Sequence, residues 1–209
     1  CGDGSEGWVR GLTVTCGRED AGMSPNIRRA IAERAREQFG LITRPQLHEL
    51  GIATGQVHRL LHAHHLERRG RNVFAVAGAP VGFEPSVLAA CLDTGGVASY
   101  RTAARLHRLH GFGAAEVVEV TVPRRRHHSS PVPVVVHTST NLGHDDLVHV
   151  GAIPTTSVAR TFLGLAALVP DAVGYEAVRT AVAVAARDGQ VSDAWLWWRL
   201  EHLRCRGRD

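Results

Sequence analysis

The chain has 209 residues, of which 44% are hydrophobic and 21% are charged, a composition typical of a folded protein and not of a disordered or collagen-like one. All 24 basic residues are Arg, and the formal net charge is +4. Apolar stretches such as 181–186 are far shorter than the ~20 residues that a membrane span needs, so we expect no contact with a membrane.

The basic residues are unevenly distributed along the chain. Residues 1–22 hold two Arg and four acids, whereas residues 23–78 hold nine Arg and four acids. Residues 79–209 are nearly balanced, with 13 Arg and 12 acids. The segment 23–78 is therefore the first candidate for a unit that binds a polyanion.

Residues 1–22 are rich in Gly and charged residues and show no sustained hydrophobic periodicity. The only Met is Met23, and Ser24 and Pro25 after it are typical of a helix start. We interpret 1–22 either as an extension outside the natural reading frame or as a disordered segment, and we assign it no role.

Three helices and a hairpin are predicted in residues 23–78. Apolar residues recur at helical spacing over 25–39, and Gly40 ends this helix. Thr43 is the expected N-cap of a short second helix that ends at Gly51, and Thr54 is the expected N-cap of a third helix over 55–64. The segments 66–69 and 73–76 read as the strands of a hairpin around a Gly/Asn turn.

This order of elements is that of a winged helix. A short turn joins the second and third helices as in a helix-turn-helix, whose second helix enters the major groove of DNA. We therefore predict an N-terminal winged helix-turn-helix over 23–78.

The remaining residues, 80–209, are predicted to form a helical region around a small β-sheet, so the fold class is α+β. Helices are expected over 85–94, 99–109, 157–168, 170–187 and 192–203, and strands over 117–122, 134–136 and 147–150. A basic loop, Arg124 to His128, lies between two of these strands. It either contacts the DNA backbone or acidic groups of a partner, or is simply solvated.

Several short blocks resemble one family. F-G-L-I-T-R-P-Q-L at 39–47, L-E-R-R at 66–69 and V-F-A-V at 73–76 are similar to the winged-helix domain of AbiEi-type antitoxins from type IV toxin–antitoxin systems. V-A-S-Y-R-T-A-A-R-L-H at 97–107, V-E-V-T-V-P at 118–123 and I-P-T-T-S-V-A-R-T at 153–161 resemble later blocks of the same actinobacterial group.

The resemblance implies a cytoplasmic transcriptional regulator that binds double-stranded DNA at its own promoter and opposes a nucleotidyltransferase-like toxin. Many members of the group continue into a very-short-patch-repair-like endonuclease domain. This sequence has no later D…[DE]-x-[KR] strand pair and no Lys, so we expect no enzymatic activity.

The residues expected to contact DNA lie on the helix-turn-helix and on the hairpin. Gln can bridge adenine and Arg can bridge guanine in the major groove, whereas Arg at a wing grips phosphates or enters the minor groove. The alternative reading is a solvated helix face and a solubilising hairpin. The expected set is Arg44, Thr54, Gln56, Arg59, His62, Arg68, Arg69 and Arg71.

We expect no cofactor and no metal ion. His58 and His62 have the i, i+4 spacing of a metal pair, but no nearby Cys completes a site, and surface histidines are the simpler reading. Ser99 and Ser157 are interpreted as helix caps because no nucleophile motif surrounds them. The four Cys lack metal-site spacing and are read as reduced cytosolic thiols.

The helix predicted at 192–203 holds three of the four Trp. Trp197 and Trp198 diverge by ~100° on a helix, so these side chains cannot all face one core. Either a partner or a second copy covers some of this surface, or the helix is simply well packed.

Three hypotheses on function remain open at this stage. The first is the DNA-binding regulator. The second is the non-catalytic front part of a truncated or split nuclease fusion. The third is a protein-interaction module whose winged helix does not contact DNA.

Overall fold

The computed structural model describes residues 24–113, 117–124, 133–168 and 172–203. An N-terminal unit comprises α1 (Pro25–Arg36), β1 (Leu41–Thr43), α2 (Arg44–Glu49), α3 (Thr54–His62), β2 (Leu66–Arg68) and β3 (Val73–Val76). The C-terminal unit starts with α4 (Phe83–Thr94), β4 (Val97–Ala98), α5 (Tyr100–Leu106), β5 (Val118–Pro123) and β6 (Val134–Ser139). It continues with the 3-10 helix η1 (His144–Asp146), β7 (Leu147–Val150), β8 (Ile153–Thr156), α6 (Val158–Leu168), α7 (Ala172–Arg187) and α8 (Asp193–Leu203).

The N-terminal unit is a three-helix cluster on a small antiparallel sheet of order β1-β3-β2. The apolar stripes predicted for the three helices meet in one core around the fully buried Phe74. The first helix ends at Arg36 and not at residue 39, because Phe39 and Gly40 turn the chain with positive φ into β1. The structure thus confirms the predicted helices and hairpin and adds a short strand that the sequence analysis missed.

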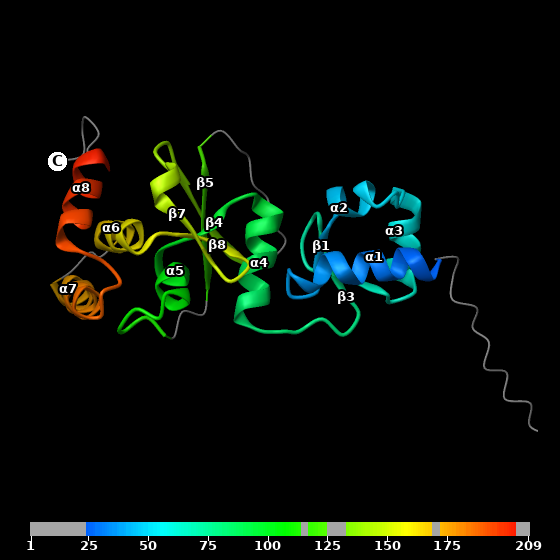
Figure 1. Cartoon of the computed structure of the whole chain (residues 1–209), viewed down its shortest axis with the longest axis horizontal. Coiled ribbons are helices and arrows are strands. Elements are labelled where there is room, and N and C mark those ends of the chain that lie inside the picture. Colours follow the sequence, from blue (N-terminus) through cyan, green and yellow to red (C-terminus); the bar gives the residue numbers. More distant parts are fainter. Residues whose placement is uncertain (1–23, 114–116, 125–132, 169–171, 204–209) are drawn as a thin grey trace, which may run out of the picture.

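The C-terminal unit is built on a five-stranded mixed sheet of order β6-β5-β4-β8-β7. Strand β5 runs parallel to β6, and β4 runs parallel to β8, while the other two pairings are antiparallel. Helix α4 covers one face of this sheet, and α5 lies on the other face with α6, α7 and α8 beyond it (Figure 1). The predicted α+β class is therefore confirmed.

Helix α4 lies between the two sheets (Figure 1). One continuous cluster of buried residues joins Leu41 and Val73 of the first sheet, Val87 and Leu88 of α4, and Val120 of the second sheet. A helix can bury itself on both sides only if it is apolar nearly all round, and six of the twelve α4 residues are buried. Its thiol, Cys91, is free, and burial raises its pKa to about 12.

Three serines stand at helix starts in this unit, and the side chains of two of them cap the helix. Ser157 Oγ accepts the backbone N–H of Arg160 at 3.4 Å, and Ser192 Oγ accepts that of Trp195 at 3.2 Å. Ser99 occupies the N-cap position of α5, but its buried hydroxyl makes no hydrogen bond to any described residue. The reading of Ser99 as a side-chain cap is therefore wrong.

A buried carboxylate ties α5 and β6 to β5. Glu119 Oε1 lies 3.0 Å from Arg101 Nη1, and Glu119 Oε2 lies 3.5 Å from His137 Nε2. Burial acts to raise the pKa of the Glu119 carboxyl, but His137 and Arg101 outweigh that effect and hold the pKa below its ordinary value. The ring of Tyr100 packs on the ring of His137, with 3.9 Å between the two ring centroids. Tyr100 itself has a positive φ of 51°.

The last helix is attached by a buried ion pair. Both Arg199 Nε and Arg199 Nη2 on α8 donate to the carboxylate of Asp146 in η1, which also accepts the backbone N–H of Gly143. Asp146 is 0% exposed and Arg199 is 5% exposed. Removing one partner of such a pair leaves an uncompensated buried charge, which costs far more than losing an exposed pair.

We therefore expect Arg199→Met to lower the free energy of unfolding by about 3–5 kcal/mol, measured by urea denaturation followed by circular dichroism. The double variant Asp146→Asn/Arg199→Met should lose less than the sum of the two single changes, because neither charge remains. Arg187→Met, which removes an exposed pair with Asp188, is the control and should cost less than about 1 kcal/mol. An Arg199→Met protein as stable as the control would contradict this account.

Candidate nucleic-acid interface

Helices α2 and α3 follow each other across a short turn, and side-chain contacts fix the start of each helix. Thr43 and Gln46 form a reciprocal capping box: the Gln46 N–H donates to Thr43 Oγ1 at 3.3 Å, and the Thr43 N–H donates to Gln46 Oε1 at 2.8 Å. The turn between the helices passes through Gly51, whose φ of +77° suits a residue without a Cβ. Ile52 then buries its side chain in the N-terminal core.

Helix α3 begins one residue earlier than predicted. Thr54 is its first residue and Ala53 occupies the N-cap position, so the expected capping role of Thr54 is wrong. The N–H of Ala53 donates instead to Gln56 Oε1 at 2.9 Å. Gln56 is therefore partly engaged in holding the helix start, although its amide nitrogen remains a donor.

The exposed face of α3 carries Arg59 and His62, as predicted, together with His58. Val57 and Leu60 are buried on the opposite side. The sequence analysis preferred surface histidines to a metal pair for His58 and His62, and their i, i+4 relation places both on this outer face. The exposed face of α3 thus presents one guanidinium and two imidazoles.

A second group of predicted residues gathers where α2 meets the β2–β3 hairpin. The guanidinium carbons of Arg44 and Arg68 lie 5.4 Å and 5.5 Å from the centroid of the Phe74 ring. Arg68 Nη1 also donates to the backbone carbonyl of Arg71 at 3.1 Å. The start of α2 and the hairpin therefore bring three Arg residues, 44, 68 and 71, to one place.

The hairpin turn is not free on all sides, because it rests on α4. The backbone N–H of Asn72 donates to Asp93 Oδ1 at 2.9 Å, and Gly70 is buried against the same carboxylate, where an added Cβ would lie 2.6 Å from Asp93 Cγ. Arg69 is half-buried and paired with Glu67 at 2.9 Å. Of the three hairpin Arg residues, Arg68 and Arg71 are exposed.

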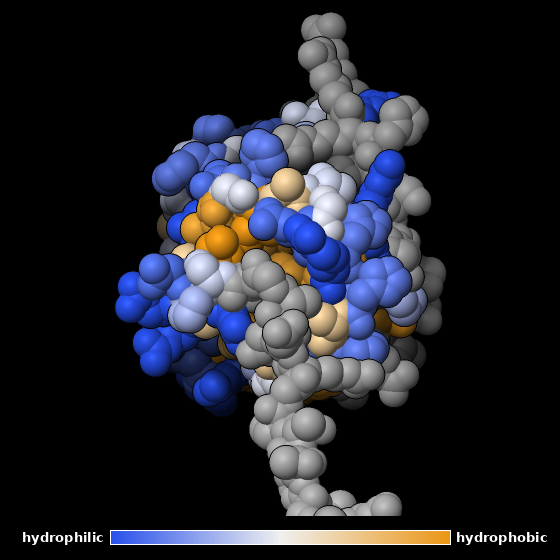
Figure 2. All heavy atoms as spheres, turned by 90° about the vertical axis from the view of Figure 1, so that its right-hand side faces the viewer, coloured by the Kyte–Doolittle hydropathy of each residue, from blue (hydrophilic) through white to orange (hydrophobic). Residues whose placement is uncertain are grey.

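The end of the molecule formed by α1, α2 and α3 carries hydrophilic side chains around most of its rim and hydrophobic ones nearer the middle (Figure 2). Among the described residues, no group of three or more His, Cys, Asp and Glu could hold a metal ion. No described helix is both long and apolar enough to cross a membrane. In the basic loop only Arg124 is described, and 125–128 lie outside the described residues.

The N-terminal unit can be compared with known families. Residues 19–77 match the model of a family described as transcriptional regulator, AbiEi antitoxin. The matched segment contains every helix and strand of the N-terminal unit. The AbiEi match thus covers the part of the chain that carries all eight predicted contact residues.

The fold of the chain as a whole, beyond the N-terminal unit, has a counterpart among solved structures. The crystal structure of the RV2827C protein from Mycobacterium tuberculosis is 16% identical and superposes with a TM-score of 0.50. The similarity covers 88% of this chain and 73% of that one, and at this identity it concerns the fold alone. No curated protein matches the chain.

We predict that Asp93 holds the hairpin turn in place. Asp93→Ala removes the acceptor of the Asn72 N–H, whereas Asp93→Asn keeps an acceptor oxygen and removes only the charge. Loss of one hydrogen bond of about 1 kcal/mol should make the Asn72 amide exchange with solvent roughly fivefold faster in Asp93→Ala. Asp93→Asn should stay close to the wild type, with amide exchange followed by NMR. Equal exchange rates in all three proteins would show that the turn does not depend on this contact.

Proposed function

We propose that this chain is a DNA-binding transcriptional regulator of the AbiEi type, whose N-terminal unit is a winged helix. The observation that carries the proposal is the order α2, short turn, α3 and β2–β3 hairpin within the AbiEi match. In a helix-turn-helix of this kind the second helix enters the major groove. Here that helix is α3, and the hairpin is the wing.

In this proposal the two groups of residues on the N-terminal unit have different tasks. Arg59 on the exposed face of α3 reads a base edge, a contact worth about 1–3 kcal/mol of discrimination. Arg44, Arg68 and Arg71 contact phosphates, which fix the position of the protein without reading sequence. Thr54, Gln56 and His62 complete the α3 contacts, and Arg69 acts mainly through its pair with Glu67.

The DNA would be the promoter of its own operon, and a second partner would be a cognate toxin of the nucleotidyltransferase type. Both assignments rest on the AbiEi match. A regulator of this kind acts by binding in the cytoplasm and needs neither catalysis nor a cofactor. The third proposed partner is a second copy of the chain, which would associate through the Trp-rich helix α8.

The proposal is tested by replacing Arg59 and Arg71 separately with Ala. Arg59→Ala should reduce the ratio of affinities for promoter and random DNA by roughly 5- to 100-fold. Arg71→Ala should weaken binding to both DNAs by similar factors. It should also reduce the slope of log affinity against log salt by about 1, because one phosphate contact and its counterion release are lost. The measurement is fluorescence anisotropy on both DNAs at several salt concentrations.

The matched control is Arg29→Ala, which removes an exposed Arg of α1 that is paired with Glu33. It should change affinity least of the three, because it removes the same formal charge away from the proposed contact surface. If neither Arg59→Ala nor Arg71→Ala weakens binding at low salt, these surfaces do not contact DNA. The role of a protein-interaction module would then be the better explanation.

A further inference from the structure

The polarity of α8 is inverted. The residue of α8 that is buried is the charged Arg199, whereas Trp197 is 63% exposed, Trp195 is 39% exposed and Leu200 is 36% exposed. A surface helix normally buries its apolar stripe and exposes its charges. Trp197 and Leu200 are three positions apart and share one side of the helix, whereas Trp195 stacks on Trp198. Apolar surface exposed together in this way on a folded protein marks a contact with another molecule.

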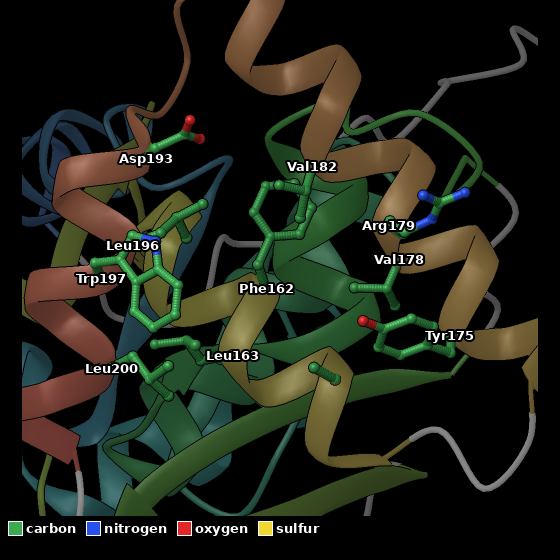
Figure 3. Close-up of a pocket in the computed structure, with 11 residues that line it drawn as sticks. Phe162, Leu163, Tyr175, Val178, Arg179, Val182, Asp193, Leu196, Trp197 and Leu200 are labelled. Atoms are coloured by element: carbon green, nitrogen blue, oxygen red, sulfur yellow. The ribbon is translucent and has the colours of Figure 1, made fainter.

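Trp197 and Leu200 border a groove between α6, α7 and α8, whereas Trp195 lies outside it. Its volume is about 300 Å³. Figure 3 shows Phe162 at its base, Leu200 and Trp197 on the α8 side, and Tyr175 and Val178 on the α7 side. Tyr175 is itself 56% exposed, so both walls of the groove offer large apolar surfaces to an incoming side chain.

The charges that line this groove have opposite signs on opposite walls. Arg179 stands on the α7 wall and Asp193 at the start of α8 on the other (Figure 3). A patch with a single sign would indicate a partner of the opposite sign. A patch with one charge of each sign on facing walls is complementary to itself after a rotation of 180°, which is the condition for contact across a two-fold axis.

We propose that two copies of this chain associate across a two-fold axis through this groove. Trp197 and Leu200 of each copy pack against the α7 wall of the other, and Arg179 of each copy pairs with Asp193 of the other. Within one copy Arg179 pairs with Glu176 at 2.9 Å, but both side chains are more than half exposed, so this pair is weak and exchangeable. The proposal specifies the contact for the self-association named above and is independent of DNA binding.

The apolar part of the contact is tested with Trp197→Ser. Because Trp197 is largely exposed in the single chain, the variant should fold, with an unchanged melting temperature at concentrations where both proteins are monomeric. Its dimer dissociation constant should rise at least about tenfold, since an exposed Trp at the centre of a contact is a typical hot spot. Sedimentation equilibrium without DNA measures this constant. A wild-type chain that stays monomeric at high micromolar concentration, or a Trp197→Ser dimer as tight as the wild type, overturns the proposal.

The charge pairing is tested by mixing two variants. In a homodimer of Arg179→Glu, each new Glu faces Asp193 of the other copy. In a homodimer of Asp193→Arg, each new Arg faces Arg179 of the other copy. Both contacts are repulsive, so each variant alone should be mainly monomeric. In a mixed dimer of the two variants both pairs have opposite signs, so an equimolar mixture should dimerise again. Arg187→Glu, a charge reversal on α7 outside the groove, is the control and should dimerise like the wild type.

A mixture that stays monomeric overturns the two-fold pairing, as does an Arg179→Glu protein that dimerises like the wild type. If the groove instead receives a helix of a different protein, the wild type is monomeric and mixing changes nothing. Because these measurements contain no DNA, a failure here and a failure of the proposed regulator function are separate results.

Discussion

Helix α4 has to bury two opposite sides at once, and the rest of the architecture depends on how it does so. One side packs on the β1-β3-β2 sheet and the other on the five-stranded sheet, so a single apolar core runs through the helix. Units joined only by a linker usually move relative to each other unless their contact is large and hydrophobic. Here the contact is a shared core, and Asp93 adds a polar anchor to the hairpin turn. The N-terminal unit therefore has its orientation set by the C-terminal one.

The opposite end of the molecule is held by a different force. The buried residue of helix α8 is a charged one, Arg199. Its ion pair with Asp146 fixes the position of the guanidinium and therefore of the helix. Burying two charges is costly in desolvation, so such a pair contributes more to a unique geometry than to net stability. A helix fixed in this way is free to expose its Trp residues, which an ordinary amphipathic helix would have used for its own attachment.

The sequence was most informative where a local pattern decides the structure. The stripe of Val57 and Leu60, the capping Thr43 and the turn at Gly51 act over a few residues, and the N-terminal unit follows from them. The strands β1, β4 and β8 were missed, although β2, β3 and β7 are equally short and were predicted. Strands β1 and β4 form only by pairing with segments far away in the chain, which leaves no local pattern to detect.

The candidate site was predictable in part for the same reason. Exposure of Arg59 and His62 follows from helical spacing, whereas the contacts of Gln56 with Ala53 and of the hairpin turn with Asp93 do not. The Asp93 contact joins residues 21 positions apart, across two units. The buried pairing of Arg199 with Asp146 was equally hidden, because nothing near Arg199 in the chain distinguishes it from the other 23 Arg residues.

The positions of α3 and α8 determine what kind of DNA site a pair of chains could occupy. The two helices lie at opposite ends of the longest axis of the molecule (Figure 1). Dimeric helix-turn-helix proteins that read a compact palindrome hold their recognition helices about one DNA turn, roughly 34 Å, apart. Association through α8 would instead point the two reading ends away from each other. On these two proposals together, such a pair would bridge two separate stretches of duplex and close the DNA between them into a loop.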